Sequence, residues 1–234
     1  MNRAKKYSII SSDVLLFHLL RYSTSKVCAF RPWISRKSYL TPPTVVSTLT
    51  AMLASHGYMK ASFVGHSYGT SWVSYMCKYA SHTIASVLFV DPICFCLHHP
   101  CLTKSFVYHR ADPGSISYFV KTDVIVNWTI QRSFPWARIS LFMEDIPEVP
   151  CSVFISDHDI LIPVEPILKY FRRKGAHFCD EGCPTSEYST KGEMNVTVLK
   201  GQAHGDWTER SSTSTSIATT AKFLTEQYEA KFST

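Results

Sequence analysis

The sequence predicts an α/β fold in which helices cover both faces of a mostly parallel sheet. From residue 41 onward, short apolar runs alternate with segments of helical periodicity. The clearest apolar run lacks polar alternation, as expected for a strand that is buried on both faces. Strands that alternate with helices are typical of parallel sheets. With 234 residues, the chain is long enough for one large core but not for two comfortable domains.

The first helix is expected to begin at Thr41 and Pro42, which suit an N-cap and a first helical position. Its apolar residues recur at helical spacing until Gly57, a residue type that favours a helix end. Residues 61–64 then predict a short strand, and residues 84–90 predict a second, more apolar one. Between them lies a helix whose apolar side chains are expected on one face: Trp72, Val73, Met76 and Tyr79.

The second half of the chain continues the alternation after an interruption. Residues 94–149 are rich in aromatic residues, histidine and proline, and we interpret them as a helical insertion. Strands are then predicted at 151–155 and 195–199, with a helix at 163–173 that ends near Gly175. The final helix is expected to carry its apolar side chains on one face: Ile217, Ala221, Leu224, Tyr228 and Phe232.

The composition is that of a globular protein. Hydrophobic residues make up 45% of the chain and charged residues 18%, which excludes a disordered chain. A net charge of +6, with no Lys/Arg run longer than three, gives no basis for expecting a nucleic-acid partner. Eight cysteines in 234 residues are too few for a small disulfide-stapled domain. The oligomeric state does not follow from these features.

Residues 1–40 do not fit the alternation and are expected to form a divergent N-terminal segment. Their apolar stretch, residues 7–20, resembles a signal peptide or membrane anchor, but Asp13 and His18 interrupt it. The longest uninterrupted apolar run there is far shorter than the roughly 20 residues of a spanning helix. A cytoplasmic or membrane-associated location is therefore favoured over secretion.

Residues 65–69 read Gly-His-Ser-Tyr-Gly, the pattern G-x-S-x-G, between a predicted strand and a predicted helix. In this setting the chain makes a sharp turn that presents the serine oxygen above the sheet. Small residues are needed two positions to either side, because the strand and helix backbones come close there. The helix N-terminus also favours negative charge that develops near Ser67. The motif therefore predicts a nucleophilic serine on a strand–turn–helix elbow.

A nucleophilic serine needs a base, and ten histidines are candidates. His204 lies just after the last predicted strand, in a loop that opens at the same edge of the sheet as Ser67. His66 adjoins the serine, but the turn is expected to direct its side chain elsewhere. Three further histidines belong to the insertion: His98, His99 and His109. We therefore expect His204 to act as the base.

The base in turn needs a carboxylate that orients it, and the sequence leaves three candidates open. Asp159 follows the strand predicted at 151–155 and gives the chain order Ser, Asp, His. Asp157 lies two residues earlier and could take the same place. Asp91 ends the strand at 84–90 and reaches the same edge of the sheet. Asp159 is favoured, with Asp91 and Asp157 as alternatives.

Together these segments resemble the serine-type α/β-hydrolase family, in particular its lid-bearing esterases and lipases. Four segments carry the resemblance: GHSYG at 65–69, SVLFVDP at 86–92, SDHDILIP at 156–163 and GQAHGDW at 201–207. The third segment resembles the acid loop of the family, with Ser156 where glycine is usual. The resemblance extends over roughly residues 41–230.

The resemblance implies a catalytic triad of Ser67, Asp159 and His204, with the amide of Tyr68 as one donor to the oxyanion. It implies hydrolysis of carboxylic esters or related acyl compounds through an acyl-enzyme, without a metal or cofactor. It also implies a hydrolase core at 41–234 with a lid insertion at about 96–149. The expected partner is a small-molecule or lipid acyl substrate. Relatives on this fold that place an aspartate at the elbow are excluded by the serine.

The chain departs from the family before the elbow. Only 64 residues precede Gly65, and in residues 1–40 we identify no strand followed by the His-Gly loop that supplies the second oxyanion donor. The chain is therefore expected to be truncated at its N-terminus and to be a poor catalyst, since one lost donor costs roughly 3–4 kcal/mol of transition-state stabilisation. The alternative function is that of a weak or inactive α/β-hydrolase remnant with a binding role, or an incomplete gene product.

Three further groups of residues are weaker signals. One is rich in cysteine and histidine, but its spacing fits no structural zinc site, so no metal is expected: Cys94, Cys96, His98, His99 and Cys101. Another consists of cations that suit a helix end and offer at most a weak contact with an anionic membrane surface: Arg172, Arg173 and Lys174. The aromatic residues of the insertion either line an apolar acyl pocket or pack the lid onto the core: Phe106, Tyr108, Tyr118, Phe119, Trp128, Phe134, Trp136 and Phe142.

Overall fold

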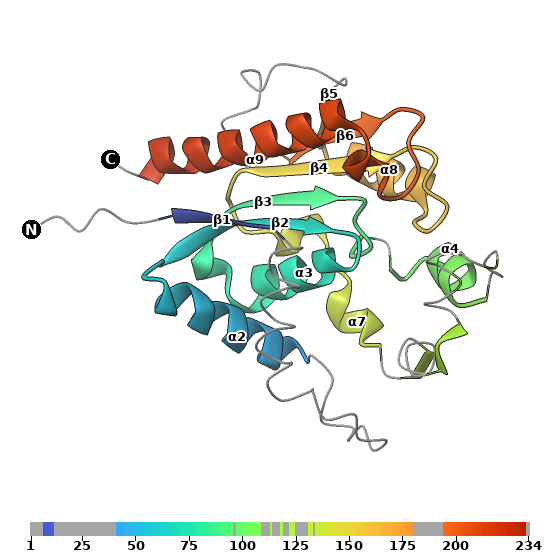
Figure 1. Ribbon diagram of the computed structural model, residues 1–234, viewed down its shortest axis with the longest axis horizontal. Helices are drawn as coiled ribbons and strands as arrows, with labels where there is room; N and C mark the ends of the chain where they lie inside the picture. Colours follow the sequence, from blue (N-terminus) through green and yellow to red (C-terminus); the bar gives the residue numbers. More distant parts are fainter. Residues whose placement is uncertain are drawn as a thin grey trace, which may run out of the picture.

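The computed structural model describes residues 7–11, 41–95, 97–108, 134–179 and 194–232, together with residues 113, 118, 122–124, 131 and 132. One six-stranded sheet runs through these residues in the order β1-β2-β3-β4-β6-β5, and every neighbouring pair of strands is parallel. Helices lie on both faces of the sheet (Figure 1). The α/β fold class predicted from the sequence is confirmed.

The strands are β1 (Tyr7–Ser11), β2 (Lys60–His66), β3 (Ile84–Val90), β4 (Cys151–Ser156), β5 (His177–Cys179) and β6 (Met194–Leu199). Four of them, β2, β3, β4 and β6, lie within two residues of the strands that the sequence predicts. The sequence does not predict β5, which has only three residues.

β1 lies within residues 1–40, the segment that the sequence marks as divergent and in which it identifies no strand followed by a His-Gly loop. It pairs in parallel with β2, from Tyr7 opposite Lys60 to Ser11 opposite Val64. Local composition did not reveal this strand, because its place in the sheet depends on a backbone partner some 50 residues away in the chain. The other residues of the divergent N-terminal segment, 1–6 and 12–40, lie outside the described residues.

The helices are α2 (Pro42–Ser55), α3 (Gly69–Tyr79), α4 (Pro100–Thr103), α7 (Trp136–Ile139), α8 (Val164–Arg173) and α9 (Ser211–Phe232). Short 3-10 turns are η1 (Ser81–Thr83), η3 (Met143–Asp145) and η5 (Asp206–Thr208), and η2 (Lys104–Tyr108) is a short π-helix. Within the described residues, no helix is both long and apolar enough to cross a lipid bilayer.

β3 lies within the sheet and is buried along its whole length. Alternate side chains point to opposite faces of a strand, so Val87 and Phe89 pack into one apolar core while Leu88 and Val90 pack into another. This arrangement explains why the sequence of β3 lacks polar alternation, since helices cover it on both sides.

The two cores differ in size. The larger one lies between the sheet and α2, α3 and α8, and includes the edge-to-face ring pairs Phe89–Phe95 and Phe95–Phe171. The smaller one lies under α9, where Leu224 packs with Phe154 and Leu88. Figure 1 shows α9 on one face of the sheet and α2 and α3 on the other.

Most of the apolar side chains predicted on one face of each helix are buried. In α9, Ile217, Ala221, Leu224 and Tyr228 are all buried, and the side chain of Phe232 lies outside the described part. In α3 the prediction is wrong for Tyr79, which is 55% exposed. The sheet, α2 and α7 enclose the central residues of α3 from Thr70 to Cys77, whereas Tyr79 is its last residue.

Three cysteine side chains, Cys77, Cys94 and Cys151, are buried in the larger core. Burial raises the pKa of the Cys77 thiol to about 12, and it raises the pKa of the other two thiols as well. All three are therefore protonated, unreactive core residues in the folded chain at neutral pH.

The returning limb of the insertion, residues 134–150, is fixed to the body of the fold. Ser74 Oγ of α3 donates to the Ile139 carbonyl at 2.8 Å, and the Leu141 amide donates to the Cys94 carbonyl at 2.9 Å. The Met143 amide donates to the Tyr170 hydroxyl at 2.9 Å. These bonds hold α7 against α3 and η3 against α8.

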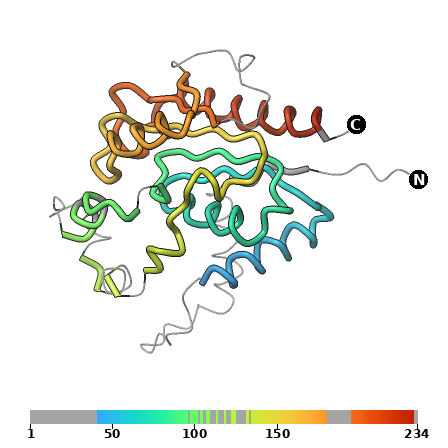
Figure 2. The backbone as a smooth tube through the Cα atoms, turned by 180° about the vertical axis from the view of Figure 1, so that it is seen from behind, coloured from blue at the N-terminus to red at the C-terminus, as the bar shows by residue number. Residues whose placement is uncertain are grey.

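The rest of the insertion is described only in part. Its described helices, α4, η2 and α7, are short. Figures 1 and 2, which view the chain from opposite sides, both show α4 beyond the carboxyl ends of the strands. Residues 109–112, 114–117, 119–121, 125–130 and 133 lie outside the described residues. A lid over this edge of the sheet therefore stays a prediction.

Candidate active site

The functional candidates lie on four loops at one edge of the sheet. Ser67 follows β2, Asp91 follows β3, Asp159 lies in the loop after β4, and His204 lies in the loop after β6. Because all strands are parallel, their carboxyl ends meet at the same edge, where open α/β sheets carry their sites.

The turn at Ser67 has the strained geometry of a tight strand-to-helix connection. Ser67 has φ of 49°, in the left-handed region that few side chains adopt. Its amide donates to the Val90 carbonyl at 3.0 Å, which ties the turn to β3. A Cβ added to Gly65 would lie 2.8 Å from Val73 Cγ2 and 3.1 Å from Thr70 Cα, so glycine is required there.

Thr70 closes this turn from the helix side. Its Oγ1 donates to the Ser67 carbonyl at 2.6 Å and accepts from the Ile93 amide at 3.2 Å. The buried threonine therefore links the serine turn to the segment that follows β3. The turn is fixed by the first turn of α3 and by the neighbouring strand together.

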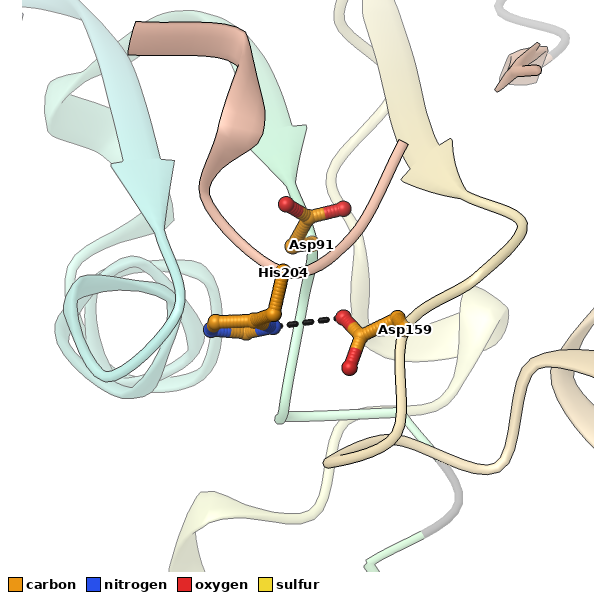
Figure 3. Close-up of side chains that lie close together, drawn as sticks. All are labelled: Asp91, Asp159 and His204. Carbon is orange, nitrogen blue, oxygen red and sulfur yellow. Dashed lines mark hydrogen bonds and ion pairs between the residues drawn. The ribbon is translucent and has the colours of Figure 1, made fainter. Parts of the chain in front are cut away.

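The structure brings Ser67, His204 and Asp159 into one hydrogen-bonded chain. His204 Nε2 lies 2.7 Å from Ser67 Oγ, and His204 Nδ1 lies 2.5 Å from Asp159 Oδ2. Figure 3 shows the bond between His204 and Asp159. The side chain of Asp159 is fully buried and that of His204 is 14% exposed.

Asp159 is held by its own loop. Its Oδ1 accepts from the Leu161 amide at 2.7 Å and from the Ile162 amide at 3.2 Å. These two amides stabilise the buried negative charge and leave Oδ2 for His204. The loop sequence after β4 therefore determines which of the two carboxylate oxygens meets the imidazole.

The alternative acids, Asp157 and Asp91, have other partners. Asp157 Oδ1 accepts from the Gly201 amide at 2.7 Å, and Oδ2 lies 3.7 Å from Lys200 Nζ. Asp91 Oδ1 accepts from the Ser156 amide at 2.8 Å, and its Oδ2 accepts from the Gly205 amide at 3.0 Å. Both bind backbone amides of the site loops, whereas Asp159 binds the imidazole.

The loop that carries His204 is fixed at several other points. The His158 amide donates to the Gln202 carbonyl at 2.9 Å, and the Ala203 amide donates to Asp206 Oδ2 at 2.8 Å. Gly205 has φ of 85°, a conformation that suits glycine. These hydrogen bonds fix the backbone of the loop that carries the imidazole.

The pKa of His204 is raised above its ordinary value. Burial is the largest single influence and lowers the pKa, because it disfavours the charged imidazolium. The hydrogen bond to Asp159 and the charges of Asp159 and Asp91 together outweigh burial. The ring therefore becomes a neutral proton acceptor only above a pH higher than its ordinary pKa would require.

Tyr68 occupies the N-cap of α3, directly after Ser67. Amides in the first turn of a helix have no acceptor within the helix, and the helix N-terminus attracts negative charge. The Tyr68 ring is 45% exposed and lies 6.0 Å from both the Trp72 and the Phe134 ring centroids. The place of the Tyr68 amide suits a donor to an anion beside Ser67.

Four of the described aromatic side chains of the insertion fall into two groups. Phe134 and Trp136 are partly buried against the larger core, and their ring centroids are 4.5 Å apart. Tyr108 and Phe142 are largely exposed. Phe106, Phe119 and Trp128 lie outside the described side chains, so neither the pocket nor the packing interpretation is decided for the whole set.

The group of cysteines and histidines does not gather around one point in the part that the structure describes. Cys94 is buried, His98 stacks on Phe142, and His99 Nδ1 accepts from the Cys101 amide at 3.3 Å. Cys96 lies outside the described residues. One atom each of Asp91, Asp159 and His204 do lie within 4.8 Å of one another, but hydrogen bonds already engage these side chains. Asp159 binds the His204 ring, and Asp91 binds the backbone amides of Ser156 and Gly205.

The cations at the end of α8 are exposed. Arg172 lies over the Phe178 ring at 4.8 Å, and Lys174 forms an ion pair with Glu144.

Sequence reasoning did not identify the bonds of Asp91 to the amides of Ser156 and Gly205. Its one signal is the position of Asp91 at the end of the most buried strand, where an unpaired carboxylate would be costly.

No protein-family model matches the chain, and no curated protein matches it significantly. Several solved structures share its architecture. A variant of the meta-cleavage product hydrolase from Pseudomonas fluorescens IP01 has a TM-score of 0.55 and 11% identity, over 97% of this chain and 92% of that one. The esterase Pf2001 of Pyrococcus furiosus has a TM-score of 0.51 and 11% identity, over 97% of this chain and 84% of that one. At such identities the likeness concerns the fold alone.

Proposed function

We propose that this chain, which has the α/β-hydrolase fold, is a serine hydrolase that cleaves carboxylic esters or related acyl compounds. One observation carries the proposal: the continuous hydrogen-bonded chain from Ser67 through His204 to Asp159 at the carboxyl edge of the sheet. A nucleophile, a base and an orienting carboxylate in this order are the groups that acyl transfer through a serine needs.

In the first half of the reaction, Ser67 Oγ attacks the carbonyl carbon of the ester while His204 Nε2 takes the hydroxyl proton. The carbonyl oxygen becomes an oxyanion in a tetrahedral intermediate. The bond to the leaving oxygen then breaks, and the His204 proton passes to the leaving alkoxide. The acyl group remains on Ser67 as an ester, and Asp159 stabilises the imidazolium for as long as His204 carries the proton.

In the second half, water takes the place of the alcohol. His204 removes a proton from water as its oxygen attacks the acyl carbon, and a second tetrahedral intermediate forms. Its collapse breaks the bond to Ser67 Oγ, which recovers its proton from His204. The carboxylic acid leaves, and the chemistry needs no metal or cofactor.

The oxyanion is assigned to the N-terminus of α3. The amide of Tyr68, directly after the nucleophile, is the donor that this type of elbow provides. Each such donor contributes about 2.7–4 kcal/mol of transition-state stabilisation. The sequence before the elbow shows no His-Gly loop for a second donor, and residues 12–40, which follow β1, lie outside the described residues.

The insertion at about 96–149 is proposed as a lid over this edge of a core that comprises residues 41–234 together with β1. Support comes from the position of α4 beyond the carboxyl ends of the strands (Figure 1) and from the anchored limb at 134–150. The exposed ring of Tyr68 beside the partly buried Phe134 offers an apolar surface next to Ser67. An acyl group of a small molecule or a lipid is the substrate that such a surface suits.

The test is labelling of the purified chain with a fluorophosphonate, which reacts with an activated serine. We expect the wild-type chain to be labelled at Ser67 and the Ser67→Ala variant to remain unlabelled. Ser81→Ala, at an exposed serine of η1, is the matched control and keeps wild-type labelling. Hydrolysis of short p-nitrophenyl esters should follow the same order.

The alternative is a weak or inactive hydrolase fold with a binding role. A wild-type chain that is folded by circular dichroism and still fails to react with the fluorophosphonate would favour this alternative. Labelling that persists in Ser67→Ala would place the reactive serine elsewhere and contradict the proposal directly.

A further inference from the structure

Asp91 is a second buried carboxylate beside the imidazole of His204. Its side chain is fully buried, and its φ of 42° lies in the left-handed region that few residues other than glycine adopt. A charged side chain in a strained backbone position at the end of a central strand is costly, so its contacts need a reason.

The two oxygens of Asp91 bind two different loops of the site. Oδ1 accepts from the amide of Ser156, the last residue of β4, which leads into the loop that carries Asp159. Oδ2 accepts from the amide of Gly205, the residue after His204. One carboxylate therefore joins the backbone of the acid loop to the backbone of the base loop, as Figure 3 shows for its place beside His204.

Resting on the function proposed above, we propose that Asp91 is a positioning residue: it fixes the His204 loop against the end of β4, from which the Asp159 loop begins, and stabilises the imidazolium that forms during the reaction. It touches neither the substrate nor the reacting serine, and it acts through His204. The two acids have different roles: Asp159 binds the His204 ring, whereas Asp91 binds the backbone amide of the next residue, Gly205.

The charges around Asp91 support this division. Within the described residues, the titratable groups that face it are His66, with Nε2 at 3.9 Å from Oδ2, and the Asp159–His204 pair. The charge of Asp91 is one of the causes that raise the pKa of His204. Two backbone amides donate to the carboxylate, which offsets the cost of burying this polar group.

Asp91→Asn removes the negative charge and one of the two acceptor oxygens, and it keeps the volume of the side chain. An asparagine has one acceptor oxygen, so it can bind the amide of Ser156 or that of Gly205, and its own N–H₂ faces the other amide. Asp157→Asn is the matched control. Asp157 also binds an amide of the His204 loop, that of Gly201, but it is partly exposed, and it is not one of the groups that raise the pKa of His204.

The experiment measures the rate of fluorophosphonate labelling as a function of pH. The base must be neutral, so the rate rises with pH through the pKa of His204. We expect Asp91→Asn to lower the plateau rate about 10- to 100-fold, because misplacing the base is costly. We also expect its acid limb to move to lower pH, because the loss of a negative charge lowers the pKa of His204. Asp157→Asn should lower the plateau by less than about threefold and leave the acid limb in place.

A purely structural role gives a different result. Equal losses in Asp91→Asn and Asp157→Asn, with the acid limb unmoved in both, would overturn the proposal. If Asp91→Asn fails to fold, Asp91→Ser, which is smaller and also uncharged, should show the same movement of the acid limb. An unmoved limb in that variant overturns the proposal equally.

A second readout does not need activity. In histidine-labelled protein, the ring resonances of His204 can be assigned with His204→Gln and titrated by NMR. Asp91→Asn should move the midpoint of the His204 titration to lower pH, and Asp157→Asn should not. If the wild-type chain does not react with the fluorophosphonate, the proposed function fails, and this titration still decides whether Asp91 influences His204.

Discussion

The interior of the sheet and its carboxyl edge are built on different principles. In the interior, Phe89 and Phe154 are buried among apolar neighbours, and apolar packing and burial of their side chains stabilise them. At the edge, the buried side chains are polar, and Asp91 and Asp159 each accept backbone amides of the loops they fix. The interior depends on close packing without regard to bond direction, whereas the edge depends on the direction of each hydrogen bond.

This difference predicts that the interior mainly determines the stability of the fold, whereas the edge mainly determines the geometry of the site. Burial of a large apolar side chain contributes about 1.5–3 kcal/mol, whereas a single hydrogen bond contributes about 0.5–1.5 kcal/mol net. A substitution in the interior should therefore lower the free energy of unfolding and leave the reactivity of folded molecules unchanged. A substitution at the edge should lower the reactivity of folded molecules and change the free energy of unfolding little. Three substitutions test this expectation.

The largest effect is expected from Asp159→Asn. The asparagine keeps the size of the side chain but cannot stabilise the imidazolium of His204 or select its tautomer. Loss of the orienting carboxylate in such a triad lowers turnover by about 10⁴-fold, or roughly 5.4 kcal/mol of transition-state free energy. The measurement is hydrolysis of p-nitrophenyl acetate at a pH on the plateau. The midpoint of urea unfolding should move far less than that figure implies.

The control for this substitution is again Asp157→Asn, two residues away on the same loop. It should retain most of the activity, because Asp157 binds the Gly201 amide and not the imidazole. Equal losses in the two variants would mean that the loop as a whole, and not the Asp159–His204 bond, determines activity.

The next effect, in the interior, is expected from Phe89→Ala. Phe89 is fully buried and packs edge-to-face on Phe95, so truncation leaves a cavity in the larger core. Phenylalanine-to-alanine changes in cores cost about 3–5 kcal/mol of stability. Urea unfolding should show this loss, while the labelling rate per folded molecule should stay within about threefold of wild type. A labelling rate that falls as far as the stability would show that the two regions are coupled.

The smallest effect, and the sharpest test of the boundary, is expected from Gly65→Ala. This glycine ends the buried part of β2 and begins the serine turn, so it belongs to both regions. The added Cβ would lie 2.8 Å from Val73 Cγ2 and 3.1 Å from Thr70 Cα, and the helix must shift. Overpacking of this kind costs about 1–3 kcal/mol. Both the unfolding midpoint and the rate of Ser67 labelling should fall.

Gly57→Ala is the matched control for backbone strain without a clash. Gly57 has φ of 76°, and a Cβ there meets no atom within 4 Å. It should cost stability through strain alone and leave labelling of folded molecules unchanged. Wild-type labelling by Gly65→Ala would contradict the view that close approach of strand and helix fixes the serine.

Local composition is sufficient to predict the central strands. β3 is apolar at every position except Ser86, and its bounds from the sequence and from the structure agree. β1 and β5 escape prediction because they are edge strands of five and three residues. Their membership in the sheet depends on pairing with distant backbone, which leaves little trace in their own side chains.

The site follows the same division. The sequence places Ser67, His204 and three aspartates at one edge of the sheet, because parallel strands end together there. It cannot assign each carboxylate oxygen to its partner, because the loop conformations depend on distant amides such as those of Ser156 and Gly205. The preference for Asp159 rested on chain order and on the resemblance of its loop, and the structure gives Asp91 and Asp157 backbone partners.

The separation of Ser67 and His204 in the chain has a consequence in time. The two residues are 137 positions apart, and Asp159 precedes His204 by 45. At a synthesis rate of about 5–20 residues per second, Ser67 is made roughly 7 to 30 seconds before His204. During that interval the serine turn can form beside β3, but the imidazole that lies beside its hydroxyl in the fold does not yet exist. A nascent chain would therefore lack the Ser67–His204 hydrogen bond until the loop after β6 has been made and docked.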